Sequence, residues 1–149
     1  HVHKDQHIFE VAILMYKLKL SVLPVLDTDH YYLGAITLYD LARRFAKLFS
    51  LEEIGGVIVL EMNENNYSLS EISKIVESND VKILSSFIDR KHGTNVLDVI
   101  LKLDNDELSP LIQAFMRYDY NVKAVYLDQS EIGDLYKDRF DQFMKFMNI

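Results

Sequence analysis

The sequence predicts an α+β protein built from two small units in tandem. Two short apolar runs, at 22–26 and 32–37, are separated by a polar turn and lie between two amphipathic helical patterns. Two adjacent glycines, Gly55 and Gly56, then follow, and a pattern of alternating strands and helices restarts after them. Because glycine pairs disfavour a continuing helix or strand, these two residues predict the boundary between the units.

Composition limits the classes of function. The 149 residues allow one average domain or two small ones, and 49% of them are hydrophobic, as in a globular protein with a core. A formal net charge of −7 argues against a nucleic-acid or anionic-membrane partner. No apolar run approaches the roughly 20 residues that span a bilayer. The absence of cysteine excludes disulfides and thiolate metal sites, and we expect a cytoplasmic protein.

The first unit is predicted to have the order helix, strand, strand, helix. Apolar residues recur at helical spacing over 8–20, and strands are expected at 22–26 and 31–37. The short connection makes these two strands antiparallel. Pro24 removes one backbone donor, which predicts that its strand lies at an edge or leaves that position unpaired. A second helix is expected over 40–49.

The second unit is predicted to have the order β-α-β-β-α-β. Ser68 and Glu71 have the spacing of a capping box at the start of one helix, and Asp106 is expected to cap the other. Alternating apolar residues at 94–103 predict a strand with one buried face. This order is that of a ferredoxin-like sandwich, with helices on one face of an antiparallel sheet. The expected strands are 57–62, 82–89, 94–103 and 121–127.

A third amphipathic segment closes the chain at 134–149. Its aromatic and apolar residues recur at helical spacing and form an apolar stripe that needs a partner surface, on its own unit or on a second subunit. The predicted organisation is therefore 1–52 for the first unit, 55–128 for the second and 129–149 for the C-terminal helix.

One motif in the first unit carries a resemblance. A Val-Leu-Pro-Val-Leu-Asp run at 22–27 is followed by Gly-Ala-Ile-Thr at 34–37 and by Asp40. Residues 1–49 thereby resemble one CBS motif, the second member of a CBS pair or Bateman module. CBS pairs bind adenosine-containing nucleotides in the cleft between their two motifs, so the resemblance implies AMP, ATP or S-adenosylmethionine as the ligand.

The resemblance also implies which residues contact the ligand. Asp40 would accept hydrogen bonds from the ribose hydroxyls and Thr37 would contact ribose or phosphate, while Val22, Leu23 and Pro24 would face the adenine. A carboxylate suits this role because it offers two acceptor oxygens to adjacent hydroxyls. A local role remains open, because Asp40 also lies where a helix N-cap belongs.

A Bateman module needs two motifs, and the pattern has no second copy after residue 50. Either a preceding segment or another subunit therefore supplies the other half of the cleft. The chain begins at His1 rather than Met, as expected for a piece of a longer protein. His1, His3 and His7 crowd this end, but we expect no metal site there, because terminal segments fray.

Residues 55–128 resemble an ACT domain, a family with the same order of elements that binds amino acids or other small effectors. ACT domains often carry a Pro- or Gly-bearing loop after the first strand, whereas the corresponding loop here, 63–68, has neither residue. Asn63, Asn65 and Asn66 are the candidate effector ligands in this loop, and a solvated loop is the alternative.

A CBS pair followed by an ACT domain resembles the acetoin-utilisation-type regulatory proteins of bacteria. We therefore expect a regulatory small-molecule sensor that acts as a homodimer and has no bound cofactor or metal. The alternative is a structural dimerisation module with no ligand. We do not expect an enzyme, because no pattern unites a nucleophile, a base and a charge stabiliser.

Overall fold

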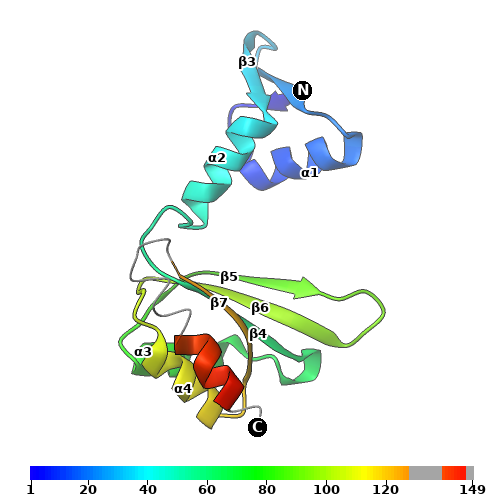
Figure 1. Ribbon diagram of the computed structural model, residues 1–149. Helices are drawn as coiled ribbons and strands as arrows, with labels where there is room; N and C mark the ends of the chain where they lie inside the picture. Colours follow the sequence, from blue (N-terminus) through cyan, green and yellow to red (C-terminus); the bar gives the residue numbers. More distant parts are fainter. Residues whose placement is uncertain (128–138, 147–149) are drawn as a thin grey trace. The chain divides into compact units, whose positions relative to one another are not determined.

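The computed structural model describes residues 1–127 and 139–146. Their contacts divide the chain into two units, His1–Leu51 and Glu52–Ile149, and both units contain helices and a sheet (Figure 1). The predicted mixed α+β class is confirmed. In the part of the chain that is described, no helix is both long enough and apolar enough to cross a bilayer.

The first unit packs two helices with a three-stranded sheet whose strand order is β1-β2-β3. Its strand β2 pairs antiparallel with β3, as predicted, and also parallel with β1, which the sequence did not reveal because two residues carry no periodicity. Strand β2 is therefore not an edge strand. However, β1 pairs only with Val25 and Leu26, so Pro24 has no β1 residue opposite it. The elements are β1 (Val2–His3), α1 (Ile8–Leu18), β2 (Val22–Leu26), β3 (Tyr32–Thr37) and α2 (Leu38–Leu48).

The core of the first unit is small. Val11 and Met15 of α1 pack with Leu23 of β2 and Leu41 of α2, and Val2 of β1 completes this buried cluster. Other large apolar side chains of α1 stay exposed, so the helix presents apolar surface on more than its buried side. Burial in a unit of this size leaves little stability to spare.

The second unit contains a four-stranded sheet with two helices on one face (Figure 1). The strand order is β5-β6-β4-β7, and every neighbouring pair is antiparallel. Each helix therefore connects two strands that run in the same direction with one strand between them. Helix α3 connects β4 to β5, which β6 separates, and α4 connects β6 to β7, which β4 separates. The elements are β4 (Val57–Asn63), the 3₁₀ turn η1 (Glu64–Asn66), α3 (Leu69–Ser78), β5 (Ile83–Arg90), β6 (Val96–Leu103), α4 (Ser109–Arg117), β7 (Asn121–Tyr126) and a helix at 139–146.

Strand β6 shows why this sheet has one apolar face. Its alternate residues Leu97, Val99, Leu101 and Leu103 are buried against the helices, as their period of two predicts. Asp98 and Lys102 lie on the other face, as predicted, but they too are buried. Asp98 Oδ2 accepts a 2.6 Å hydrogen bond from Lys123, whereas Asp98 Oδ1 has no hydrogen-bond partner among the described residues and lies 4.0 Å from the Lys91 ammonium. Lys102 donates to two backbone carbonyls.

Those carbonyls belong to the segment that leads into β4. The Lys102 ammonium donates to Glu53 O at 2.8 Å and to Gly55 O at 2.7 Å. Gly56 N donates to Asn105 O at 3.0 Å, and Leu103 N donates to Gly56 O at 2.9 Å. The glycine pair is therefore held against the end of β6 within the second unit, rather than forming a free joint between the units.

Three local predictions need correction or restriction. Asp106 does not cap α4: Leu108 holds that position without a side-chain hydrogen bond, and an Asn105 side chain bonds the Glu107 amide instead. Ser68 caps α3 by accepting from Glu71 N at 3.3 Å, but the Glu71 carboxylate interacts with Tyr120 instead of turning back.

In the C-terminal helix Phe140 packs on the core of its own unit; much of 134–149 lies outside the described residues.

Replacement of Gly55 by alanine tests the close approach of Gly55 to the backbone of Leu103. A Cβ at Gly55 would lie 1.9 Å from Leu103 O, and its φ of +150° also disfavours other residues. Gly34 has a similar φ of +154° but nothing within 4 Å of its Cβ position. We expect Gly55→Ala to destabilise its unit by more than about 2 kcal/mol and Gly34→Ala to cost its own unit about 1 kcal/mol. Urea unfolding followed through amide NMR signals of each unit measures both; equal effects would contradict the close approach.

Candidate functional site

The predicted pair Thr37 and Asp40 joins the end of β3 to the start of α2. Thr37 is the N-cap, and its Oγ1 accepts a hydrogen bond from Asp40 N at 3.2 Å. In return, Thr37 N donates to Asp40 Oδ2 at 2.9 Å and Thr37 Oγ1 donates to the same oxygen at 2.7 Å. The pair forms a reciprocal capping box. Asp40 is thus the third helical residue rather than the N-cap that its position had suggested.

The box leaves part of the carboxylate available. Within the described part of the chain, the hydrogen bonds to Asp40 all reach Oδ2, and the side chain is exposed. The backbone hydrogen bond from Thr37 lowers the pKa of Asp40 most, and the Thr37 hydroxyl and the charge of Arg43 lower it further against a small effect of burial. An ionised carboxylate with one oxygen unengaged can accept a hydroxyl donor while it caps the helix.

The three residues predicted to face adenine divide between two faces of the sheet. Val22 and Pro24 are exposed, whereas Leu23 between them is buried in the core. Val22 lies opposite Thr37 in the β2–β3 ladder, and directly opposed residues share a face. The structure therefore brings Val22, Pro24 and Thr37 onto one face and leaves Leu23 on the other.

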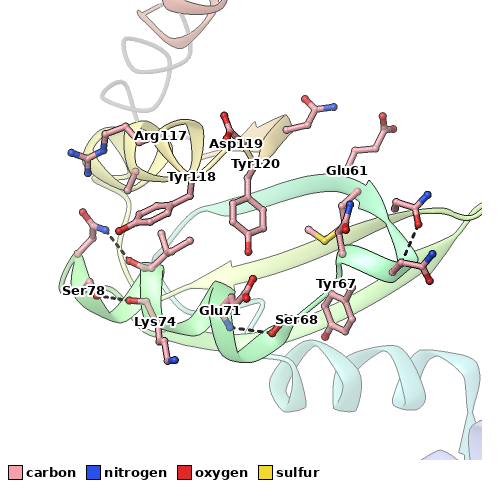
Figure 2. Close-up of a pocket in the computed structure, with 18 residues that line it drawn as sticks. Glu61, Tyr67, Ser68, Glu71, Lys74, Ser78, Arg117, Tyr118, Asp119 and Tyr120 are labelled. Carbon is pink, nitrogen blue, oxygen red and sulfur yellow. Dashed lines mark hydrogen bonds between the residues drawn. The ribbon is translucent and has the colours of Figure 1, made fainter.

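The predicted effector loop lies at the far end of β4 from the glycine pair. Asn63 caps the short turn η1, and its Oδ1 accepts from Asn65 N at 3.1 Å. Asn63, Asn65 and Asn66 all line a groove of about 1070 Å³ within the second unit, which Figure 2 shows in close-up. The three amides are thus at a concave surface rather than on a loop tip.

The remaining walls of the groove come from α3 and from the α4–β7 connection. They contribute Tyr118, Tyr120 and the carboxylate of Glu71, and a third tyrosine, Tyr67, comes from the end of η1. Tyr120 packs edge-on against Phe115, with ring centroids 5.5 Å apart. Sequence reasoning missed these residues because they belong to segments far apart in the chain. The tyrosines that flank Asp119 were the available signal, since exposed aromatic residues at a helix end frequently mark contact surfaces.

Tyr120 and Glu71 meet inside the groove. Figure 2 shows the Tyr120 hydroxyl directed at the Glu71 carboxylate. Burial raises the pKa of Tyr120 most, and the negative charge of Glu71 and the hydrogen bond to it raise this pKa further. At neutral pH the phenol therefore stays protonated, with its hydroxyl facing the Glu71 carboxylate. Glu71 also lies in the first turn of α3, where the helix dipole favours its negative charge.

The three histidines near the N-terminus do not all cluster with one another: His7 is separate from His1 and His3. His7 caps α1, with its Nδ1 accepting from Phe9 N at 3.2 Å. The rings of His1 and His3 instead lie beside His30, with centroids 6.0 and 5.9 Å from that of His30 and 5.2 Å from each other. In the described residues, no group of three or more His, Asp or Glu side chains is placed to hold a metal ion.

Comparison with known families concerns the first unit. Residues 1–47 match the family model described as CBS domain. The match covers α1, both strands of the β2–β3 hairpin, the Thr37–Asp40 box and nearly all of α2. It supports a CBS-domain protein, in agreement with the resemblance drawn from the residues at 22–40.

Replacement of Asp40 by asparagine tests the capping role through pH. Because the folded pKa lies below its ordinary value of 3.8, ionised Asp40 stabilises the folded state above that pH. We expect Asp40→Asn to lower the unfolding temperature of the first unit at neutral pH. The difference from the wild type should vanish as the pH falls through the lowered pKa. Thr37→Ala should cost about 1 kcal/mol at neutral pH, and part of this cost should persist at low pH, because the N-cap oxygen is lost at any pH. A pH-independent Asp40→Asn effect would contradict this role.

Proposed function

We propose that the chain belongs to a regulatory sensor whose first unit takes part in binding an adenosine nucleotide. The observation that carries the proposal is the Asp40 carboxylate: Oδ2 completes the capping box, and no described residue donates a hydrogen bond to Oδ1. Val22 and Pro24 supply apolar surface on the face that Thr37 shares. Hydroxyl acceptors beside an apolar face suit a ribose joined to an adenine. The CBS match over 1–47 supports this class of ligand.

The proposal requires a partner for the first unit, and we propose a second copy of the chain in a homodimer. On α1, Phe9 is 47% exposed, Ile13 is 52% exposed and Tyr16 is 84% exposed. Such contiguous apolar surface on a unit with a small core favours association. A second helix-strand-strand-helix unit, from a partner subunit or from a preceding segment, would then complete the nucleotide cleft.

For the second unit we propose an ACT-type effector domain. The order β-α-β-β-α-β, the strand order β5-β6-β4-β7 and the helices on one face support a ferredoxin-like arrangement. The groove beside Asn63, Asn65 and Asn66 would hold an amino acid or another small effector. Together the two units would resemble the acetoin-utilisation-type regulators, with recognition rather than catalysis as their role.

Regulation would follow from differential binding. A ligand shifts an equilibrium only as far as its affinity differs between the two states. A nucleotide that bridges two CBS-type units would favour their closed pairing, and an effector in the groove would favour one arrangement of α3 and α4. The two ligands would then influence each other through the shared dimer.

A structural dimerisation module is the second candidate. The observation that favours it is the completeness of the capping box, because Thr37 and Asp40 satisfy each other without any ligand. In that case the exposed apolar residues of the first unit would serve association alone.

Calorimetry with AMP, ATP and S-adenosylmethionine separates the two candidates. The sensor proposal predicts measurable binding of at least one of them to the wild-type chain. It predicts an affinity about ten-fold lower in Asp40→Ala, because a charge-assisted hydrogen bond is lost. Asp29→Ala is the matched control, since Asp29 is an exposed carboxylate in the turn of the same hairpin. No heat at millimolar nucleotide, with Asp40→Ala lowering stability alone, would favour the structural module.

A further inference from the structure

The groove of the second unit has an anionic centre. Glu71 is the carboxylate that turns into it, where it meets Tyr120 (Figure 2). Two other acidic residues line the groove, but Figure 2 shows Glu61 and Asp119 directed outward. Glu61 is moreover paired with Lys91 at 2.5 Å on the other face of the sheet. Glu71 is therefore the charge that an incoming ligand meets.

The cationic residues at the groove leave this centre uncompensated. Lys74 and Arg117 both contribute to the lining, one from α3 and one from α4. Figure 2 shows both side chains extending away from the Tyr120–Glu71 pair. Among the described residues that line the groove, the side chains nearest to a ligand between the tyrosines would thus be the Glu71 carboxylate and the Tyr120 phenol rather than an ammonium or guanidinium group.

Three tyrosine rings line the same groove. Tyr118 and Tyr120 lie on either side of Asp119 in the sequence. Asp119 has a φ of +62° and belongs to the tight turn between α4 and β7. Tyr67 forms part of the opposite side of the groove, next to the capping residue Ser68. The faces of tyrosine rings carry negative potential and attract a cation within about 6 Å. Rings and carboxylate therefore favour the same sign of charge.

We infer that this groove recognises an organic cation, a small molecule that carries a protonated amine or guanidinium group beside an apolar portion. The inference rests on the proposed effector role of the second unit and names the chemistry of its ligand. Glu71 accepts a hydrogen bond from the cation, and the tyrosines cover its apolar portion. The side-chain amides of Asn63, Asn65 and Asn66 provide neutral acceptors at the edge of the groove.

Three probes with one ring and different charges test the inference on the full chain. Benzylammonium, benzyl alcohol and benzoate are titrated into ¹⁵N-labelled protein, and amide shifts report where each one binds. We expect benzylammonium to shift amides of 63–71 and 118–121. Its affinity should be about ten-fold higher than that of benzyl alcohol, because a charge-assisted bond replaces a neutral one. Benzoate binding as tight as benzylammonium binding would overturn the inference.

Variants then assign the charge to one residue. Glu71→Gln should lower benzylammonium affinity about ten-fold and leave benzyl alcohol unchanged. Glu77→Gln removes an equal charge from the same helix at a residue that is likewise exposed but does not line the groove, and it should have no effect. Tyr120→Phe retains the ring and releases the carboxylate from the phenol, so benzylammonium should bind at least as tightly as before. Loss of binding in Tyr120→Phe, or none in Glu71→Gln, would contradict the assignment.

Failure of this inference is distinguishable from failure of the proposed function. Benzoate that binds in the groove would leave the effector role standing and overturn the cationic class. No shift at 63–71 or 118–121 with any probe would overturn both the cationic class and the effector role. Nucleotide binding by the first unit is judged separately by calorimetry and does not depend on either result.

Discussion

The close backbone approach at Gly55 and Gly56 is the constraint on which the second unit depends. It joins the start of β4 to the end of β6 through hydrogen bonds at both ends of Gly56, while Lys102 holds the preceding carbonyls. The ladder that follows runs without a shift from Val57 opposite Lys102 to Asn63 opposite Val96. The glycine pair thus sets the register that delivers the asparagine loop to the groove at the other end of β4.

The first unit depends on a small buried core and on one capping box. Its buried core is a single small cluster, and the reciprocal capping box of Thr37 and Asp40 joins β3 to α2. The Asp40 carboxylate stabilises the start of α2 through Oδ2, and Oδ1 is the oxygen that the proposed ligand would use. A unit with so little buried surface and so much exposed apolar surface would gain stability from association, so in the proposed homodimer folding, dimerisation and nucleotide binding would be linked.

Local sequence patterns predicted many of the helices and strands, but they did not predict the groove of the second unit. The bounds of β2, the direction of β3 and the alternation in β6 follow from periodicity and turn chemistry over a few residues. The helix caps were less certain, because Thr37 and Asp40 compete for one position and only the backbone decides between them. Glu71 and Tyr120 could not be paired from sequence, since their meeting depends on how α3 and α4 pack on the sheet.

Amide hydrogen exchange at low and high protein concentration tests most directly whether the first unit is completed by a partner while the second unit stands alone. We expect amides of α1, β2 and α2 to exchange more slowly as the protein concentration rises. Amides of β4 and β6 should be well protected at both concentrations, because their core is contained within one chain. Protection of the first unit that is equally high at both concentrations would contradict the account.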